Sequence, residues 1–429
     1  MGKAVRTERR RVVVLGTGFA GYHCLRRLEH RLPADDAEII AVTPTDYMQY
    51  VPLLPEVTAG TLAPLAVAVP LRTHLPRTRL VLGTVTGVDI DGRACSVADT
   101  EGHRRMVRYD RLVLTCGSVT RLPAVPGVAE HAQGFKSVAE ALHLHDHILQ
   151  QLEFAEQCDD PEERAARLTF VVVGAGYTGT EVAAQGALLT RRALRGRPGL
   201  RGQPVRWVLL DLASRVLPGL DARLSGPTAG VLRRRGVDVR LGRTVTEVTG
   251  DCVLMSDGTK LAARTLVWCV GVRPDPLVTS LGLPTTDGRL TVDETLTVPG
   301  HAGIFAAGDA AAVPDRTRPG ATTPMTAQHA ERQGRAAADN VAASLGRGRV
   351  RAYKHRDLGF VVDLGGWQAV ANPLGIRLSG PVAKAATRGY HLYALPGGRF
   401  RVAADWIAGA LAHPPMVQFG LVPEPRLRP

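Results

Sequence analysis

The sequence lacks several features that mark other classes of protein. Its six cysteines form no C-x-x-C or C-x-x-x-x-C pair, so the sequence predicts neither a zinc knuckle nor a dithiol shuttle. No apolar run approaches the roughly 18 residues that a transmembrane helix needs, and low-complexity segments and heptad repeats are absent. Unpaired cysteines in apolar runs are typical of a reduced compartment, and we expect a cytoplasmic protein with an ordinary globular core.

The charge of the chain is strongly basic, but no recognition motif accompanies it. The formal net charge is +13, and the basic residues are spread along the whole chain. Because no nucleic-acid reading motif is present, we expect no nucleic-acid partner. Weak attraction to an anionic membrane surface is the alternative to a merely basic surface. His143, His145 and His147 alternate in a helical stretch, where residues two apart do not share a face, so no metal site is predicted.

Two glycine-rich segments organise the rest of the chain. An apolar run at 11–15 ends in Gly-x-Gly-x-x-Gly at 16–21, and the pattern recurs at 170–173 and 174–179. In this fingerprint the glycines permit a tight turn and a close approach of the backbone to a pyrophosphate, which faces the N-terminus of the next helix. Two fingerprints predict two bound dinucleotides. One chain that holds both suggests a flavin and a nicotinamide placed face to face.

The order of the predicted elements indicates one domain inserted into another. A strand at 11–15, a helix at about 18–31 and a strand at 38–42 begin one βαβ unit, and the second fingerprint begins another. A late strand at 304–310 ends in Gly-Asp and belongs with the first unit. We therefore predict an α/β fold with two Rossmann-like dinucleotide-binding domains, the second inserted in the first, plus a small C-terminal α+β domain. The predicted FAD-binding domain is 1–125 with 290–347, the NAD(H)-binding domain is 126–289, and the C-terminal domain is 348–429.

Two local patterns give further expectations. Apolar and polar residues alternate over 79–97, which predicts antiparallel strands. In the C-terminal piece the pattern predicts strands near 360–364 and 399–403, with helices near 382–393 and 404–412.

Taken in this order and spacing, the motifs resemble those of the type II NADH dehydrogenases (NADH:quinone oxidoreductases). The resemblance covers about residues 11–345. Its most particular parts are Pro-Leu-Leu-Pro at 52–55 and Ala-Gln at 327–328; the other motifs that support it lie at 114–118, 174–181, 267–274 and 307–310. The resemblance implies FAD in the first domain, NADH in the second, a homodimer, and attachment to the inner face of the membrane.

The resemblance also implies an FAD site. Asp309 would accept a hydrogen bond from a ribityl hydroxyl, with Gly308 giving the backbone room to approach. Ala327 and Gln328 would begin a helix directed at the pyrimidine edge of the flavin, where the positive end of a helix stabilises the reduced ring. The other implied FAD contacts are Gly16, Gly18, Phe19, Ala20 and Gly21 at the pyrophosphate, Thr43 at a ribose, Leu53 and Leu54 near the isoalloxazine ring, Val85 at the adenine edge, and Thr115 and Gly117 over the pyrophosphate region.

The second fingerprint predicts the nicotinamide nucleotide site. Asp211 ends the following strand, and a carboxylate there accepts from ribose hydroxyls and repels a 2′-phosphate, which favours NADH over NADPH; Arg215 nearby could instead suit a phosphate. Glu181 is predicted to position the nicotinamide or to take part in proton delivery, and the alternative is an acid that complements the helix dipole in the first turn. The remaining predicted NAD contacts are Gly174, Gly176, Tyr177, Thr178, Gly179 and Gly271.

The chain departs from the family pattern at two places. Thr43 stands where an acidic residue is expected, although a hydroxyl can also bind a ribose. The Ala-Gln-x-Ala-x-Gln pattern of the quinone site ends in Arg332 instead of glutamine, which leaves the acceptor open. His329 follows Gln328 and could supply a proton; a structural histidine is the alternative.

We therefore predict an FAD-dependent NADH dehydrogenase that passes hydride from NADH to FAD and then two electrons to a quinone-like acceptor. Glu181 and Gln328 are the predicted catalytic residues. Two alternatives remain: a soluble NAD(P)H-dependent reductase of a protein or small-molecule carrier, similar to ferredoxin reductases, and a redox sensor with slow turnover.

Overall fold

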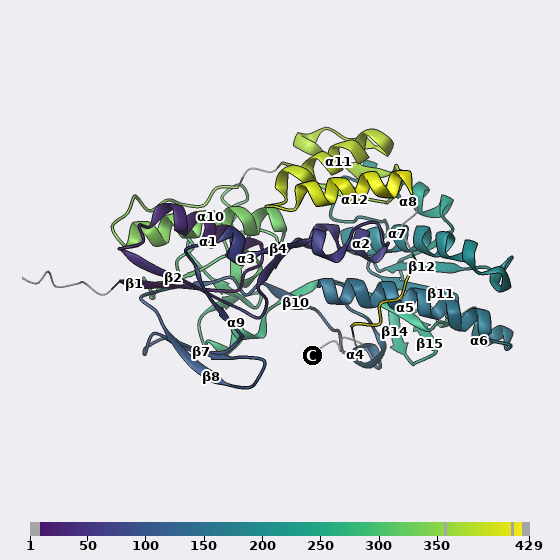
Figure 1. The fold of residues 1–429 in the computed structure, drawn as a ribbon, viewed down its shortest axis with the longest axis horizontal. Coiled ribbons are helices and arrows are strands. Elements are labelled where there is room, and N and C mark those ends of the chain that lie inside the picture. The colour runs from purple at the N-terminus through teal and green to yellow at the C-terminus, as the bar shows by residue number, and fades with distance from the viewer. Residues whose placement is uncertain (1–8, 356–357, 413–415, 423–429) are drawn as a thin grey trace, which may run out of the picture. The chain divides into compact units, whose positions relative to one another are not determined.

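The computed structural model describes residues 9–355, 358–412 and 416–422, which fall into two compact units (Figure 1). Among these residues the first unit comprises 9–49, 68–119 and 273–355, and the second comprises the rest. This division differs from the three predicted domains, because residues 50–67 and the C-terminal region belong to the same compact unit as the second fingerprint. The three-domain division stays a prediction.

The first unit is built on a parallel sheet of order β21-β9-β1-β2-β5. Its strands are β1 (Arg10–Leu15), β2 (Ala37–Thr43), β5 (Arg79–Leu82), β9 (Arg111–Leu114) and β21 (Ile304–Ala306). The apolar run of β1 is completely buried, as a central parallel strand covered on both faces requires. Because neighbouring strands run in the same direction, the carboxyl ends of β1, β9 and β21 meet at one edge of the sheet.

Two helices pack side by side on this sheet, α1 (Phe19–Arg31) and α10 (Ala327–Ser344) (Figure 1). Gly334 permits the close approach: a Cβ at this position would lie 2.1 Å from the carbonyl oxygen of Ala20. The other elements of this unit are β3 (Tyr47–Gln49), β4 (Ala68–Pro70), α3 (Leu71–His74), β6 (Thr84–Asp89), β7 (Ala94–Ala98), β8 (Arg104–Arg108), α9 (Pro276–Ser280), β19 (Thr285–Thr286), β20 (Arg289–Thr291) and β22 (Ala311–Ala312).

The second unit repeats the architecture with a parallel sheet of order β13-β12-β11-β17. The strands are β11 (Thr169–Val173), β12 (Arg206–Asp211), β13 (Val237–Leu241) and β17 (Thr265–Trp268), and the long helices are α5 (Val138–Gln157), α7 (Tyr177–Ala193) and α8 (Ala222–Arg234). Ser137 and Glu140 form a capping box that starts α5. The smaller elements are α2 (Leu54–Thr58), α4 (Val128–His131), α6 (Pro161–Arg167), β14 (Val245–Val248), β15 (Cys252–Met255) and β16 (Lys260–Ala262). The segments β10 (Ser118–Thr120) and β18 (Val272–Pro274) each include one of the points where the chain passes from one unit to the other.

The C-terminal part of the second unit contains a small antiparallel sheet and two helices. The elements are β23 (Val361–Asp363), β24 (Ala369–Ala371), β25 (Leu378–Ser379), α11 (Gly380–Ala394) and α12 (Arg399–Leu411). None of the helices among the described residues is long and apolar enough to cross a bilayer.

One local prediction is wrong, and another is confirmed only in part. The strand expected at 399–403 is the start of α12: Val402 and Trp406, four residues apart, are both buried, so the apolar period is helical and not two-residue. The strands expected to be antiparallel over 79–97 differ among themselves, since β5 pairs in parallel with β2 in the main sheet and β6 and β7 pair antiparallel.

Candidate functional site

The first glycine turn lies at the carboxyl end of β1. Gly16 has a φ of +91°, and a Cβ there would lie 2.5 Å from the carbonyl oxygen of Thr115. A Cβ on Gly21 would lie 1.9 Å from the carbonyl oxygen of Gly16, so neither position accepts a side chain. At Gly18, by contrast, a Cβ would meet nothing within 4 Å. The turn is therefore packed on its inner side and open at Gly18, as a backbone cradle for a phosphate requires.

The helix after this turn offers its N-terminus to an anion. The N-cap of α1 is Gly18, no side chain caps the helix, and its first turn contains no acidic residue. The aligned peptide dipoles favour negative charge at such an end. Behind the turn, the hydroxyls of Thr17 and Thr43 lie 2.8 Å apart, and Thr43 also donates to the carbonyl of Thr45. The residues present fit the diphosphate of a dinucleotide, while Thr43 as a ribose contact stays a prediction.

The Gly-Asp turn after β21 stands at the same edge of the sheet. Ser118 Oγ lies 2.5 Å from Asp309 Oδ2, so one carboxylate oxygen is already oriented by a hydroxyl. Gly308 has a φ of +73°, and a Cβ there would lie 3.0 Å from the Cβ of Ala20. This turn therefore approaches α1 closely; the role of the Asp309 carboxylate at a ribityl chain stays a prediction.

Gln333 supports the Gly-Asp turn and was not predicted. Its Oε1 accepts from the backbone N–H of Gly308 at 2.8 Å, and its Nε2 donates to Thr323 Oγ1 at 2.9 Å. The side chain is buried. The family pattern predicted a glutamine at position 332, where this chain has arginine. The buried glutamine is the next residue, Gln333.

The start of α10 holds the predicted residues Ala327 and Gln328, both half-buried. The next residue, His329, is buried: its Nδ1 lies 3.0 Å from the hydroxyl of Tyr353, and its ring stacks on that of His355 with 3.7 Å between ring centroids. Burial raises the pKa of Tyr353 to about 12. These contacts favour the structural alternative for His329.

The second glycine turn repeats the geometry of the first. Gly174 has a φ of +104°, and a Cβ there would lie 2.6 Å from the carbonyl oxygen of Cys269. A Cβ on Gly179 would lie 1.9 Å from the carbonyl oxygen of Gly174, and Gly176 is open. No side chain caps α7, and its first turn contains no acid. Glu181 is the fifth residue of α7 and lies beyond its first turn. The alternative role for Glu181, an acid that complements the helix dipole from the first turn, is therefore not supported.

The end of β12 presents Asp211 beside this turn. Its Oδ2 accepts from the backbone N–H of Ala175 at 2.5 Å, and its Oδ1 accepts from that of Ala213 at 2.7 Å. The carboxylate is thereby fixed next to the glycine turn. The guanidinium of Arg215 donates to three carbonyl oxygens within 217–220, at 2.6 to 3.1 Å. Arg215 therefore holds its own loop, which favours a nucleotide without a 2′-phosphate.

Glu181 belongs to a buried group of charged residues within the second unit. Its Oε1 accepts from the backbone N–H of Asp363 at 2.7 Å. The Asp363 carboxylate pairs with the ammonium of Lys384, whose Nζ lies 3.7 Å from Glu56 Oε1. Trp406 Nε1 donates to Glu56 Oε2 at 2.6 Å. We call Glu56, Glu181, Asp363 and Lys384 the acid cluster.

The carboxyls of the acid cluster have different proton affinities. Burial, and then the neighbouring Asp363 carboxylate, raise the pKa of Glu56 to about 7. Burial raises the pKa of Glu181 well above its ordinary value, although part of this side chain is exposed. Burial also acts to raise the pKa of Asp363, but the Lys384 ammonium outweighs it and the pKa is lowered. The cluster therefore contains two carboxyls whose proton affinity is raised, Glu56 and Glu181, beside one whose proton affinity is lowered, Asp363.

Only Glu181 of this cluster was identified from the sequence. Glu56 directly follows the Pro-Leu-Leu-Pro sequence, which was the available signal for it. Asp363 and Lys384 lie in the C-terminal piece, where no motif marks them.

The other predicted residues are distributed between the units. In the first unit, Thr115 donates to the carbonyls of Leu15 and Gly16, Gly117 has a φ of +75°, and Val85 is half-buried in β6. In the second unit, Leu53 and Leu54 are fully buried, Tyr177 is 42% exposed, Thr178 follows it in α7, and Gly271 has a φ of +69°. Their roles at a flavin or nicotinamide stay predictions.

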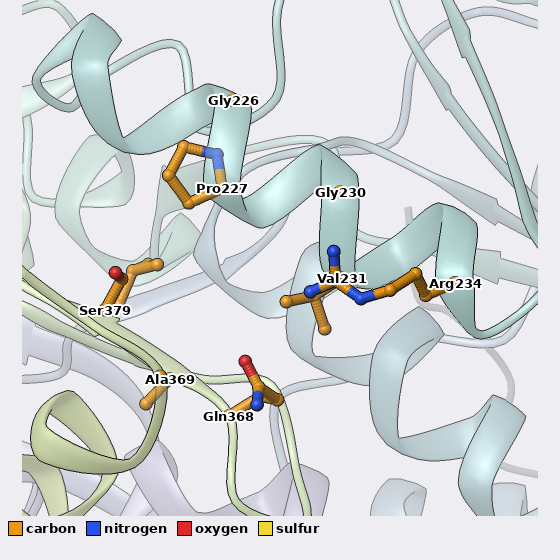
Figure 2. Close-up of a pocket in the computed structure, with 10 residues that line it drawn as sticks. Gly226, Pro227, Gly230, Val231, Arg234, Gln368, Ala369 and Ser379 are labelled. Carbon is orange, nitrogen blue, oxygen red and sulfur yellow. The ribbon is translucent and has the colours of Figure 1, made fainter.

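A pocket in the second unit contains none of these residues. It has a volume of about 320 Å³ and lies between α8 and the strands β24 and β25. Figure 2 shows Pro227, Val231 and Arg234 on the helix, with Gln368 and Ala369 opposite. No group of three or more His, Cys, Asp or Glu side chains suited to a metal occurs in the described part of the chain.

Comparison with known proteins agrees with this geometry. The sequence pattern of the pyridine nucleotide-disulphide oxidoreductase family matches residues 10–334. The type II NADH:quinone oxidoreductase Ndh of Mycobacterium tuberculosis is 33% identical over 411 residues, which are 92% of this chain and 86% of that protein. The type II NADH:quinone oxidoreductase of Staphylococcus aureus is 29% identical over 385 residues, 88% of this chain and 92% of that protein.

Solved structures share the fold. The NDH2 protein of Plasmodium falciparum, determined in complex with NADH, superposes with a TM-score of 0.87 over 96% of this chain and 100% of that one, at 18% identity. The α/β fold with two Rossmann-like domains is thereby confirmed. The chain belongs to the pyridine nucleotide-disulphide oxidoreductase family and, within it, to the type II NADH:quinone oxidoreductases.

Proposed function

We propose that this chain oxidises NADH and reduces a quinone, with FAD as its bound redox group. The proposal rests on one observation above all: each unit has a glycine turn that is open at its middle glycine, an uncapped helix behind it and an oriented carboxylate beside it. Bound FAD would supply the acceptance of a hydride and the release of two electrons. Family membership supports the same assignment.

The FAD site that we propose lies in the first unit. Gly18 and the start of α1 would hold the diphosphate, Asp309 would hold a ribityl hydroxyl, and Gln333 would keep the Gly-Asp turn in place. Gln328 has both a donor and an acceptor on its amide and is the candidate contact for a quinone carbonyl. The proposed FAD set in the first unit is Gly16, Gly18, Phe19, Ala20, Gly21, Thr43, Val85, Thr115, Gly117, Gly308, Asp309, Ala327 and Gln328; the predicted contacts Leu53 and Leu54 belong to the second unit.

The NADH site that we propose lies in the second unit. Asp211 would accept from the adenosine ribose hydroxyls, and its negative charge disfavours NADPH. Glu181 is the acid that we propose to hold or move a proton: the backbone N–H of Asp363 fixes its Oε1, and burial raises its pKa well above the ordinary value. The full proposed set is Gly174, Gly176, Tyr177, Thr178, Gly179, Glu181, Asp211 and Gly271.

Acceptor specificity decides between the proposed function and its alternatives. The test is to reduce the purified flavoprotein anaerobically with NADH and to follow flavin reoxidation by menaquinone, ubiquinone and a one-electron carrier protein. We expect fast reoxidation by a quinone. Fast reduction of the carrier with inert quinones would instead establish the ferredoxin-reductase-like alternative, and slow reoxidation by every acceptor would establish the sensor.

We also propose that the protein binds to the inner membrane surface. Large apolar side chains on α11 and α12 are 62 to 93% exposed, namely Val382, Tyr393, Phe400, Ile407 and Leu411. Such residues on a basic protein favour binding to an anionic lipid surface. Co-sedimentation with anionic vesicles should weaken in Phe400→Ser/Leu411→Ser and should remain in Met106→Ser, an exposed apolar residue of β8. Binding that both variants retain equally would contradict the proposal.

A homodimer is the oligomeric state that we propose, as the family resemblance implies. Light scattering on the detergent-free protein measures it directly. A monomer at micromolar concentration would contradict it.

A further inference from the structure

Glu56 has no part in the proposed reaction, yet its contacts connect it with Glu181. The acid cluster contains three carboxyls and one ammonium, and the side chains of Glu56, Asp363 and Lys384 are each only about 3 to 4% exposed. A buried charge is costly unless an opposite charge is in contact with it. One ammonium can neutralise one carboxylate, so at least one further carboxyl of this group must be neutral.

Geometry identifies which acid that is. Lys384 is in contact with Asp363 and stands 3.7 Å from Glu56. Glu56 Oε2 accepts from Trp406, but Glu56 Oε1 is buried and accepts no hydrogen bond from a donor group of the described residues. An ionised carboxylate with one oxygen unsatisfied in this position would be strongly destabilising. A neutral acid avoids this cost, because its proton on Oε1 can be donated to the neighbouring Asp363 carboxylate.

We propose that Glu56 is a positioning residue: in its neutral, protonated form it leaves the Lys384 ammonium to Asp363 alone and thereby keeps Glu181 in place. This inference rests on the proposed function only in the catalytic role given to Glu181. Its physical content is the protonation of a named carboxyl and the effect of that proton on a neighbouring acid.

Asp363 transmits the effect. Its carboxylate binds Lys384 and accepts from the backbone N–H of Gly365 at 2.7 Å, while its own backbone N–H donates to Glu181. These bonds fix the end of β23, which provides the donor to Glu181. When Glu56 loses its proton, the ammonium is attracted by two carboxylates, its bond to Asp363 weakens, and the donor to Glu181 is held less firmly.

The other charged groups around Glu56 and the cluster have defined partners. His145 bonds the carbonyl of Thr58, Arg192 donates to the carbonyl of Ala59, and Arg235 donates to that of Gly365. His391 contacts the hydroxyl of Tyr50, and burial lowers its pKa to about 4, so it is neutral. Arg388 lies over the Trp406 ring, 4.9 Å from its centroid. The full set by element is His145 on α5, Glu181 and Arg192 on α7, Arg235 after α8, Asp363 on β23, and Lys384, Arg388 and His391 on α11.

Infrared spectroscopy of the FAD-loaded protein tests the proton on Glu56. A protonated carboxylic acid has a C=O stretching band separate from those of carboxylates and amides. We expect a component of this band that titrates with a midpoint near pH 7, as the pKa of Glu56 of about 7 implies. It should be lost in Glu56→Gln and kept in Glu153→Gln, a partly exposed acid of the same unit. Glu181→Gln should remove a different component. A band that Glu56→Gln leaves unchanged would overturn the proposal.

A second variant keeps the test independent of the first. Trp406→Phe removes the N–H donor to Glu56 Oε2, which stabilises the ionised form, so the Glu56 midpoint should rise by about one pH unit. An unchanged midpoint would contradict the assignment even if Glu56→Gln did not fold. Both measurements are made without a quinone, so they can fail or succeed apart from the proposed function.

The positioning role has its own readout. The rate of flavin reduction or reoxidation should fall in the wild-type protein as Glu56 ionises above pH 7, and this alkaline fall should be lost in Glu56→Gln. A Gln variant that retains the same fall would show that another group causes it, and the positioning role would be wrong.

Discussion

At the scale of single residues, the most consequential side chain is Asp309. Its carboxylate is oriented by Ser118 and is presented by a turn that only glycine allows at position 308. Asp309→Ala should therefore lose FAD, because the replacement removes a charge-assisted hydrogen bond of about 1.5 to 3 kcal/mol. The ratio of flavin to protein absorbance in the purified variant measures the loss. Asp35→Ala, an almost fully exposed acid of the same unit, is the control; stoichiometric flavin in Asp309→Ala would show that the assignment is incorrect.

We expect Asp211 to determine a different property, the choice between NADH and NADPH. Both carboxylate oxygens are held by backbone N–H groups beside the second glycine turn. Removal of the charge should raise the KM for NADH by about ten- to a hundredfold, as a charged hydrogen bond of about 1.5 to 3 kcal/mol implies. The KM for NADPH should change much less, because no repulsion of a 2′-phosphate remains. Steady-state kinetics of Asp211→Ala with both nucleotides test this, with Asp238→Ala on β13 as the control. Equal loss of affinity for both nucleotides would contradict a role in discrimination.

At the scale of elements, the pairing of α1 and α10 supports the proposed FAD site. Both helices begin at the sheet edge where the Gly-Asp turn lies, and they approach through Gly334. Gly334→Ala would bring a methyl group to 2.1 Å from the carbonyl oxygen of Ala20, so the helices must separate. Overpacking of this kind costs about 1 to 3 kcal/mol.

Thermal unfolding tests this helix contact. We expect the Tm of Gly334→Ala to fall by several degrees, with weaker retention of flavin. The matched control is Gly389→Ala in α11, where a Cβ meets nothing within 4 Å; a glycine in a helix interior costs about 0.5 to 1 kcal/mol relative to alanine, so this variant should be as stable as the wild type or more so. A Gly334→Ala protein with unchanged Tm would mean that the contact is not tight.

At the scale of the whole molecule, buried neutral histidines make stability depend on pH. Burial is the main cause that lowers the pKa of His23 to about 3 and of His147 and His391 to about 4. In the unfolded chain these groups titrate near 6.5. The unfolded state therefore binds more protons below that pH, so their contribution is fully present above about pH 6.5 and is lost as the pH falls toward about 4.

The expected size of this effect is about 2 kcal/mol per histidine at pH 5. Unfolding midpoints measured from pH 7.5 to 4.5 should fall over this window. His147→Gln should make the unfolding midpoint depend less steeply on pH. His30→Gln, at an exposed position of α1, should leave this pH dependence unchanged. A midpoint that is flat between pH 6.5 and 5 would show that these histidines do not titrate as their burial implies.

Much of the fold could be predicted from local pattern. The predicted helix at 18–31 is observed at Phe19–Arg31, and the predicted strand at 38–42 is observed at Ala37–Thr43. Glycine patterns and hydrophobic periods depend on neighbours in the chain, so they are readable without tertiary structure. The prediction of a strand at 399–403 was wrong because the residues that bury Val402 and Trp406 are remote in sequence. A short run of apolar residues there fits both the two-residue period of a strand and the helical period.

What the sequence by itself determined was the pair of glycine turns, the acids Asp309 and Asp211 that follow them, and the family to which the chain belongs. Each of these motifs is short and local: a glycine turn and its helix N-terminus lie within a few residues of each other, and each acid ends a strand or follows one closely. Only the tertiary structure revealed that Gln333 holds the Gly-Asp turn and that Glu56, Asp363 and Lys384 meet near Glu181. Those residues are far apart in the chain, and their proton affinities depend on burial and on a single shared ammonium. The burial and the shared ammonium exist only once the helices and strands that contribute these residues have packed together.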